Sequence, residues 1–262
     1  MLTQLRSLIR YRMLIQSLVS RDLKARYRGS VLGFLWSFIN PLLLMLTYGI
    51  VFTYWLPVGR TPQTEPYFLF LFCGILPWSW FNASVLESSG VLMAGSNLIK
   101  KVLFPAEVLP IVNVLANLVH FLLGLPIVLI FLALYGRLAP TLVLLALPVL
   151  VQLVLTIGIA LFVSALTVHF RDVQNILGHL LHLVFWGTPI IYFYADERGE
   201  ALRPMLRWNP MTHIVFSYQQ ILFAGRFDHW RGLALAALAG LVALWLGARF
   251  FDRLRDTLAE EV

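Results

Sequence analysis

The sequence predicts an all-α integral membrane protein with six transmembrane helices, and three observations lead to that fold class. First, 60% of the 262 residues are hydrophobic and the mean hydropathy is +0.81. Second, only 13% are charged, whereas a soluble domain carries about 25% charged residues to cover its apolar interior. Third, apolar stretches recur near the length of about 20 residues that crosses the hydrocarbon core of a bilayer as a helix.

The six expected spans follow one another along the whole chain. They comprise residues 31–56, 67–86, 108–135, 141–168, 173–194 and 232–251. The fifth is the weakest, because His179, His182 and Pro189 dilute its apolar run. Residues 1–262 are therefore expected to form a single membrane domain, with spans one to five in residues 29–194 and the sixth span with a cytoplasmic tail in residues 231–262.

Lys and Arg residues near the span ends predict the side of the membrane on which each connection lies. The N-terminal segment, the connections after the second and fourth spans and the C-terminal tail hold 13 of the 20 Lys and Arg residues, and the opposite connections hold 7. Six spans bring both ends to one side, and the bias predicts that this side is the cytoplasm. Basic residues beside cytoplasmic lipid also explain the net charge of +7, so no nucleic-acid partner is expected.

Two segments outside the spans are expected to be helical without crossing the membrane. In residues 1–28 apolar side chains share one face at 100° per residue and Arg or Lys side chains lie opposite, which is typical of a helix in the membrane interface; a soluble docking helix is the alternative. Residues 195–230 are too long for a turn, and their apolar stretch MTHIVFSYQQILFAG is too short to span. Because Asn209-Pro210 is a helix-start signal, we expect short re-entrant helices there, on the outer face.

Motifs for independent chemistry are missing from the sequence. There is no GxxxxGK[ST] phosphate loop, no GxSxG and no HExxH, and the single cysteine, Cys73, excludes a cysteine-based metal site. His179 and His182 lie three residues apart near His169 and Asp172, so a metal or proton-relay site, or a membrane-embedded glycosyl- or acyltransferase, remains an alternative. Few charges lie within the spans, so a transporter of this sequence would need energy from a partner.

Aromatic residues crowd the first two spans. Those of the first span that serve as candidates for a substrate path are Phe34, Trp36, Phe38, Tyr48 and Phe52. Interfacial belts explain part of this enrichment, but several of these residues fall too deep for a belt. Aromatic faces stack on sugar rings, so they suit a polysaccharide path, and ordinary packing between spans is the alternative.

Four stretches, taken in order, resemble one family. RDLKARYRGSVLGFLWSFINPLL, NLIKKVLFPAEVLP, FRDVQNILGHLLHLVFWGTPIIY and WNPMTHIVFSYQQILF are similar to the permease subunit of type-2 ABC exporters, above all to the branch that exports lipid-linked polysaccharides such as O antigen, capsule or teichoic acid. The resemblance covers nearly the whole chain. It implies a homodimer of six-span permeases on two separate ATP-binding cassette subunits, which hold ATP and Mg, so this chain is expected to be no enzyme and to bind no cofactor or metal.

The resemblance also implies roles for particular segments. A coupling helix that receives the ATPase stroke falls on Ser88, Leu92, Met93, Asn97, Leu98, Lys100 and Lys101. Short gate helices on the periplasmic side fall on residues 203–224, with Trp208, Asn209, Pro210, His213, Phe216 and Tyr218. These assignments are expectations of the resemblance and not of the local sequence alone.

The substrate that the resemblance implies is an undecaprenyl-diphosphate-linked glycan that crosses the bacterial inner membrane. Arg26 and Arg28, with Lys24 in support, are the expected partners of its diphosphate; ordinary lipid-facing charge is the alternative. An exporter of drugs or small lipids is the alternative function within the same fold.

Overall fold

The computed structural model describes residues 11–26, 28–55, 64–96, 105–192 and 203–261, and it contains helices and no strand in these residues. The α-helices are α2 (Arg12–Arg26), α3 (Trp36–Ile50), α4 (Tyr67–Ala94), α6 (Val108–Leu134), α7 (Ala146–His169), α8 (Val173–Trp186), α9 (Arg203–Trp208), α10 (Pro210–Tyr218) and α11 (Trp230–Glu261). Short 3-10 turns, η1 (Gly33–Leu35) and η3 (Pro140–Leu145), and π-helical turns, η2 (Val51–Trp55) and η5 (Gln219–Ala224), adjoin them. The all-helical prediction is confirmed for this part of the chain.

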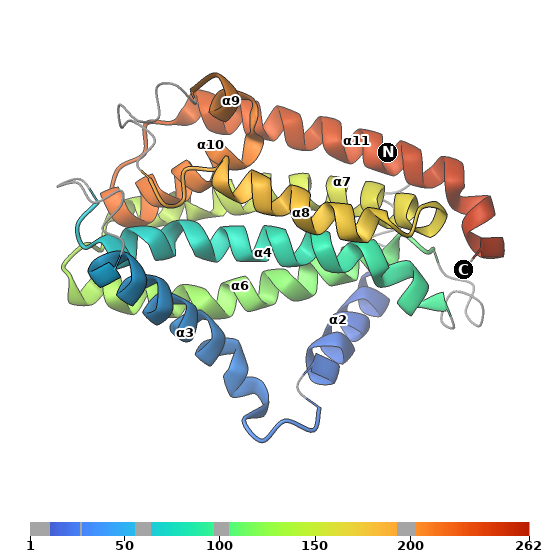
Figure 1. Ribbon diagram of the computed structural model, residues 1–262, viewed down its shortest axis with the longest axis horizontal. Helices are drawn as coiled ribbons and strands as arrows, with labels where there is room; N and C mark the ends of the chain where they lie inside the picture. Colours follow the sequence, from blue (N-terminus) through green and yellow to red (C-terminus); the bar gives the residue numbers. More distant parts are fainter. Residues whose placement is uncertain (1–10, 27, 56–63, 97–104, 193–202, 262) are drawn as a thin grey trace.

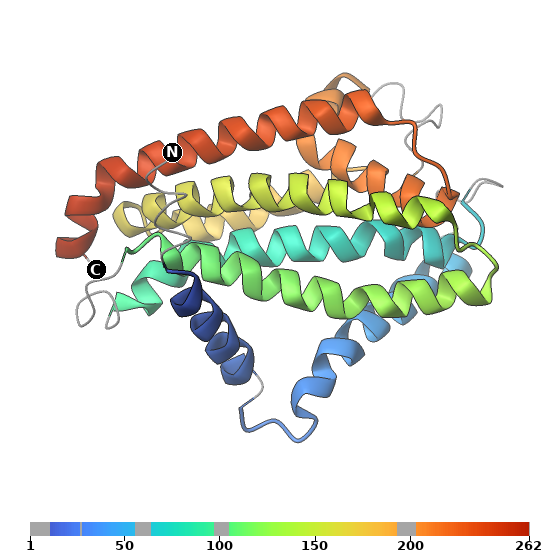
Figure 2. The ribbon, with the colours of Figure 1, turned by 180° about the vertical axis from the view of Figure 1, so that it is seen from behind.

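Four long helices form the bundle. Tyr67–Ala94, Val108–Leu134, Pro140–His169 and Trp230–Leu254 are each long and apolar enough to cross a membrane, and they run side by side with α8 (Figures 1 and 2). These helices confirm the second, third, fourth and sixth predicted spans as candidate spans.

The first and fifth predicted spans are shorter than expected. α3 begins at Trp36 and not at residue 31, because Gly29 (φ 81°) and Gly33 (φ 48°) take left-handed backbone conformations just before it, and π-helical turns extend it to Trp55. α8 ends at Trp186 after 14 residues. Pro189 cannot continue a helix and disfavours helical geometry in the residue before it, so the predicted helix through residues 187–192 is wrong.

The second span is longer than predicted. α4 continues from residue 86 to Ala94, because its apolar face still has partners there: Leu92 is fully buried beside Leu109 of α6 and Phe251 of α11. Ser88, Leu92 and Met93 therefore lie on the last turns of α4 and not on a helix apart from the second span, and their expected role in coupling stays a prediction. The remainder of that expected helix, from Asn97 onward, lies outside the described residues.

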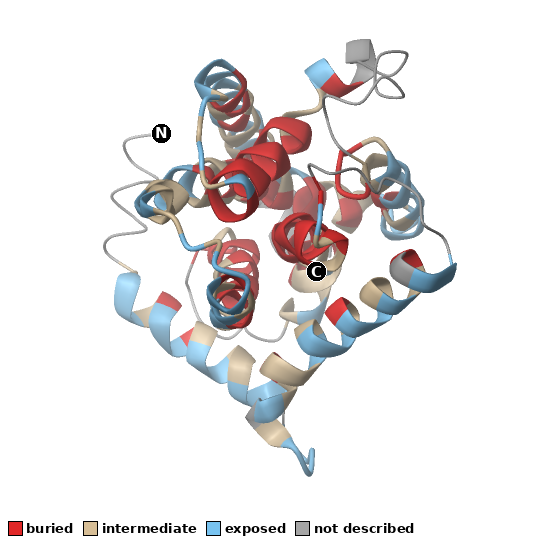
Figure 3. Cartoon of the chain, turned by 90° about the vertical axis from the view of Figure 1, so that its left-hand side faces the viewer, coloured by how far each residue is buried: buried red, intermediate tan, exposed pale blue. Residues whose placement is uncertain are grey.

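α2 and α3 form a V that stands away from the bundle (Figures 1 and 2). α2 slants from the bundle toward the apex of the V (Figure 1), and its Ile15 and Leu18 pack against Val108 and Val112 of α6. Burial is concentrated in the bundle, whereas both arms of the V are largely exposed or intermediate (Figure 3). The described part of the predicted N-terminal helix is thus helical; its residues 1–10 lie outside the described chain.

α10 enters the bundle without crossing it. Asn209 caps the helix, since its Oδ1 accepts a hydrogen bond from the Met211 backbone N–H at 3.0 Å, and Pro210 occupies the first turn. Every residue from Met211 to Tyr218 is buried, although the helix has only nine residues. Short helices in residues 203–224 therefore match the sequence prediction.

Candidate functional site

Two hollows lie against α4, and Leu44, Ser79 and Ala83 line both of them. The α6-side hollow measures about 450 Å³ and is lined by Arg26, Trp36, Ser37, Asn40, Pro41, Leu44, Leu76, Ser79, Trp80, Ala83, Glu87, Asn117, His120 and Phe121. The α8-side hollow measures about 530 Å³ and is lined by Leu44, Tyr48, Ile75, Trp78, Ser79, Asn82, Ala83, Leu86, Gly178, Leu181, His182 and Phe185. α3 and α4 contribute to both, so the two hollows are neighbours.

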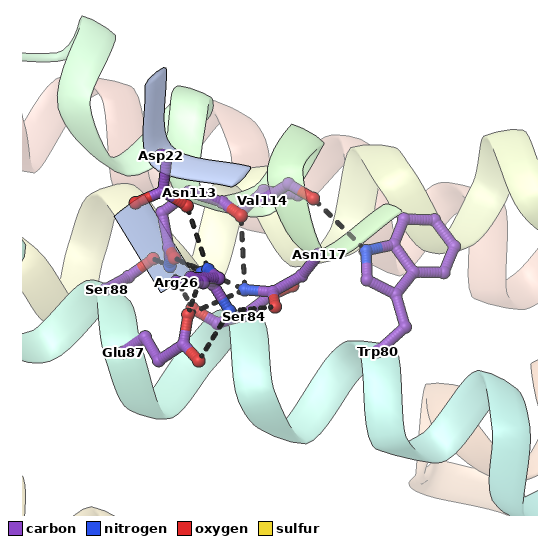
Figure 4. A network of polar contacts seen from close by, with 9 residues as sticks. All are labelled: Asp22, Arg26, Trp80, Ser84, Glu87, Ser88, Asn113, Val114 and Asn117. Carbon is purple, nitrogen blue, oxygen red and sulfur yellow. Dashed lines mark hydrogen bonds and ion pairs between the residues drawn. The ribbon is translucent and has the colours of Figure 1, made fainter. Parts of the chain in front are cut away.

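Arg26, Glu87 and Asn117, which line the α6-side hollow, belong to an ion-pair and hydrogen-bond network (Figure 4). Arg26, the last residue of α2, holds Glu87 of α4 through two hydrogen bonds, from Nη1 to Oε1 at 3.2 Å and from Nη2 to Oε2 at 2.7 Å. Its Nε donates to Asp22 Oδ2 at 2.9 Å, one turn earlier on α2. This bidentate arrangement fixes the plane of the guanidinium as well as its position.

Two asparagines of α6 complete the network. The Asn117 Oδ1 accepts from Arg26 Nη1 at 3.2 Å and its Nδ2 donates to Glu87 Oε2 at 2.8 Å. The Asn113 Oδ1 lies 3.4 Å from Arg26 Nη2, and its Nδ2 donates to Ser88 Oγ at 2.8 Å and to the Ser84 carbonyl at 3.0 Å. The network therefore joins α2, α4 and α6 at one point.

The charge of Arg26 is already compensated. Burial alone would lower the pKa of Arg26, but the hydrogen bonds and charge of Glu87, together with Asp22, outweigh it and raise the pKa above its ordinary value. The guanidinium is therefore a permanent cation with two carboxylates at contact distance. Arg26 lines the hollow as a structural member, and its expected contact with a diphosphate stays a prediction.

The other two predicted diphosphate partners lie apart from that network. Arg28 is exposed near the apex of the V. Lys24 is also exposed and lines a different, mostly apolar hollow between α2 and α6. The structure therefore does not bring the three basic side chains together around one hollow.

The predicted aromatic path residues have different environments. Trp36 lines the α6-side hollow and Tyr48 the α8-side hollow. Phe52 is buried, stacked on Tyr48 with ring centroids 5.9 Å apart. Phe38 is partly buried and packs against the core, and the side chain of Phe34 lies outside the described part. Packing between spans, the alternative given above, thus fits Phe38 and Phe52.

One face of α8 carries an exposed polar stripe. It consists of Asn175, His179, His182 and Trp186, whose spacing of four, three and four residues places them on one side of a helix. Trp186 Nε1 donates to His182 Nε2 at 3.1 Å. Among the described residues no group of three or more His, Cys, Asp and Glu side chains lies close enough to hold a metal ion.

The sequence analysis missed the neutral polar side chains inside the spans, because it considered only charged residues there. Those lining or bracing the hollows are Asn40, Ser79, Asn82, Asn113 and Asn117. Their spacing was an available signal, since Ser79 and Asn82 lie three residues apart and Asn113 and Asn117 four apart, each pair on one helix face.

The predicted coupling residues that the structure describes lie at the end of α4. Ser88 and Leu92 are buried and Met93 is intermediate, and Ser88 Oγ accepts the hydrogen bond from Asn113 given above. Asn97, Leu98, Lys100 and Lys101 lie outside the described residues. Ser88 thus ties this end of α4 to the network at the α6-side hollow.

One of the predicted gate residues, His213 of α10, contacts His229 in the segment before α11. Trp208 is exposed, whereas Phe216 and Tyr218 are buried. His213 Nδ1 lies 2.9 Å from His229 Nε2, and His213 Nε2 lies 3.0 Å from the Arg207 carbonyl oxygen. Burial lowers the pKa of His213, and burial together with the His213 charge lowers the pKa of His229 to about 4. The contact therefore joins α9, α10 and the segment before α11 through neutral imidazoles.

Comparisons with known proteins identify the family of this chain. The family model of the ABC-2 type transporter matches residues 13–223, from α2 to η5. An O-antigen export system permease protein of Myxococcus xanthus is 41% identical over 265 residues, which covers 100% of both chains. A protein of the same name from Klebsiella pneumoniae is 31% identical over 249 residues, 94% of each chain.

A more distant relative has a different cargo in its name. A polysialic acid transport protein of Escherichia coli is 24% identical over 247 residues, 90% of this chain and 92% of the relative. The family match covers far more than half of the sequence, and two relatives exceed 30% identity along almost their whole length. This chain belongs to the ABC-2 type transporter family.

Proposed function

We propose that this chain is the transmembrane subunit of an ATP-driven exporter that moves a polysaccharide across the bacterial inner membrane. Family membership supports a transporter permease, and the names of the relatives support a polysaccharide as cargo. The observation that carries the proposal is the exposed stripe of α8, Asn175–His179–His182–Trp186, beside the α8-side hollow. Polar side chains within membrane segments rarely face lipid and mark aqueous substrate paths, so this stripe faces the path.

A second copy of the chain completes the path. In one protomer the α8 stripe lies on the outside, and α3 beside it exposes a row of large apolar side chains, among them Leu43, Leu46 and Ile50. Two copies that meet along these helices would enclose the polar stripe and cover the apolar row. A homodimer is therefore proposed, with α3 and α8 as the first and fifth of six spans and with both termini in the cytoplasm.

Hydrolysis of ATP on a separate ATP-binding cassette subunit supplies the energy in this proposal. The movement of the ATPase subunit acts on residues 88–101, which include the end of α4. In the same proposal α2 lies in the cytoplasmic membrane interface, and α9 and α10 re-enter the membrane from the periplasmic side. The cargo is proposed to be linked to undecaprenyl diphosphate. Arg28 and Lys24, which are exposed, suit its phosphates better than Arg26, whose charge is compensated.

A cellular assay tests the function itself. Loss of this chain should remove polysaccharide from the cell surface, and the unexported glycan should accumulate on its lipid carrier inside the cell. The chain expressed in trans should restore export. Unchanged surface polysaccharide, with loss of drug or small-lipid export instead, would establish the alternative function.

Cysteine labelling tests the path. The only cysteine, Cys73, is fully buried, so His182→Cys introduces a single accessible thiol. A membrane-impermeant, water-soluble maleimide should label it in the assembled exporter. Leu238→Cys on the exposed face of α11 is the matched control and should stay unlabelled, because it faces lipid. Equal labelling of the two positions would contradict the proposed path.

A further inference from the structure

We propose that Arg26, Glu87 and Asn113 are positioning residues that make α2 follow the cytoplasmic end of α4. The inference rests on the proposed function, since it assumes that the partner ATPase acts on the segment after α4. A movement imposed there would then reach the α2–α3 V and the α6-side hollow beneath it. None of these residues is proposed to contact the cargo.

The contacts of α2 support a mechanical link of this kind. Its apolar packing is with α6, through Ile15 and Leu18. In the described residues its hydrogen bonds to α4 come from Arg26 and end on Glu87. A bidentate guanidinium–carboxylate pair resists both separation and rotation of the two helices, so α2 is held to α4 in a fixed orientation.

Glu87 lies close enough to the end of α4 for a movement of that end to reach the Arg26–Glu87 pair. α4 ends at Ala94, shortly before residues 97–104. Glu87 lies seven residues earlier on the same helix, which is about two helical turns. The helix is unbroken over these turns, and the hydrogen bonds from Asn113 to Ser88 and to the Ser84 carbonyl hold the same turns against α6. A displacement at Ala94 is therefore passed to Glu87 as a rigid-body movement.

The segment between α2 and α3 can respond to such a movement. Gly29 and Gly33 have φ angles of 81° and 48°, and no atom lies within 4 Å of the Cβ that either would carry. Two open glycines between the arms let α2 and α3 change their angle without a clash. The Arg26–Glu87 pair would then hold α2 to α4, and the glycine pair would let the angle between α2 and α3 change.

Stability alone does not account for the pair. The side chains of Arg26 and Glu87 are 27% and 41% exposed, and partly exposed ion pairs add little to folding. Removing the charge of Glu87 should therefore leave the bundle folded. A defect in coupling can then be separated from a defect in folding.

The experiment uses the full exporter, with its ATPase subunits, in proteoliposomes, and it measures polysaccharide transported per ATP hydrolysed. We expect Glu87→Gln and Arg26→Gln to lower this ratio by about tenfold, with ATP hydrolysis within about twofold of the unmodified protein. The exchanged pair, Arg26→Glu with Glu87→Arg, is made in the Asp22→Asn background, because the Asp22 carboxylate lies 2.9 Å from Arg26 and would repel a second carboxylate there. It should recover most of the ratio, because the Asn117 amide can reverse and still meet both groups. Asp22→Asn is the matched control, since Asp22 pairs with Arg26 on the same helix, and it should leave the ratio unchanged.

Three results would overturn the inference. The first is a normal ratio of transport to ATP hydrolysis in Glu87→Gln, and the second is a ratio in the exchanged pair no higher than in the single variants. The third is a loss of subunit assembly and ATP hydrolysis together with transport, which would mean a purely structural role. Failure of the proposed function gives a different result: the unmodified exporter would then transport no polysaccharide with ATP, whatever the state of the pair.

Discussion

Gly247 of α11 lies directly against Gly158 of α7: a Cβ on Gly247 would stand 2.1 Å from the Gly158 carbonyl oxygen. Gly158 is crowded by the same helix, since a Cβ there would meet the backbone of Ala243 and Leu244 of α11. Close approach of two backbones at small residues is a common means of packing helices within membranes, where dispersion contacts and not the hydrophobic effect drive association. The contact holds the last span in the bundle.

Substitution at this contact should loosen the bundle. We expect Gly247→Ala to lower the free energy of unfolding by about 1–3 kcal/mol, because the neighbouring atom is backbone and cannot move aside. Thermal unfolding in detergent measures the change. Gly178→Ala on α8 is the control, since nothing lies within 4 Å of its Cβ position; equal melting temperatures for the two variants would contradict the prediction.

Acid should weaken the contact between α10 and the start of α11. The Arg207 carbonyl only accepts, so His213 Nε2 carries a hydrogen, and the neutral His213 Nδ1 accepts a hydrogen bond from His229 Nε2. The pKa values of both groups are lowered in the fold, so the stabilisation is present above the ordinary pKa of 6.5 and is lost as pH falls towards about 4. Asp228 and Arg207 are the charged neighbours that act on the pair.

The melting temperature should therefore fall between pH 6.5 and pH 4. The lowered pKa of His229 corresponds to about 3 kcal/mol of folding free energy at most. His229→Gln should flatten the dependence, whereas the exposed His179→Gln should keep it. A melting temperature of the unmodified protein that stays constant over this range would contradict the prediction.

The spans could be predicted from the sequence because their apolar composition determines that they form helices in lipid. A run of about 20 apolar residues has no stable alternative to a helix in lipid, and the described part of the chain contains four such helices. The end of the fifth span was missed because Pro189 was counted as a dilution of hydropathy and not as a helix terminator. The continuation of α4 could not be read, because it depends on the burial of Leu92 against Phe251, which is distant in sequence.

The candidate site was less predictable, because its contacts also join residues that are distant in sequence. Arg26 and Glu87 are 61 positions apart, and nothing local in either segment indicates that they meet. The sequence therefore presented Arg26 as an available cation, whereas the structure pairs it with two carboxylates. The short helices of residues 203–224 were predictable, because Asn209-Pro210 and the short apolar run specify them locally.

Exposed basic residues should contribute more to substrate affinity than Arg26, whose charge is already paired. We expect Arg28→Gln to raise the KM for a diphosphate-linked glycan by about fivefold at low salt, since one basic residue near an anionic surface contributes about 1 kcal/mol. The effect should shrink as salt screens the charge. Arg253→Gln, an exposed position on α11, is the control. A KM unaffected by Arg28→Gln, or an equal effect of the control, would exclude Arg28 as a phosphate partner.

The size of the two hollows should limit transport, because Ala83 lines both. Ala83→Phe places a large side chain where α3 crosses α4 and should cut the rate of export by about tenfold or more. Ala83→Ser adds one hydroxyl to a wall that already holds Ser79 and Asn82, so it should retain export. The two variants are compared at matched expression and matched ATP hydrolysis, which separates a blocked path from a misfolded protein. Normal export by Ala83→Phe would mean that the cargo does not pass along this face of α4.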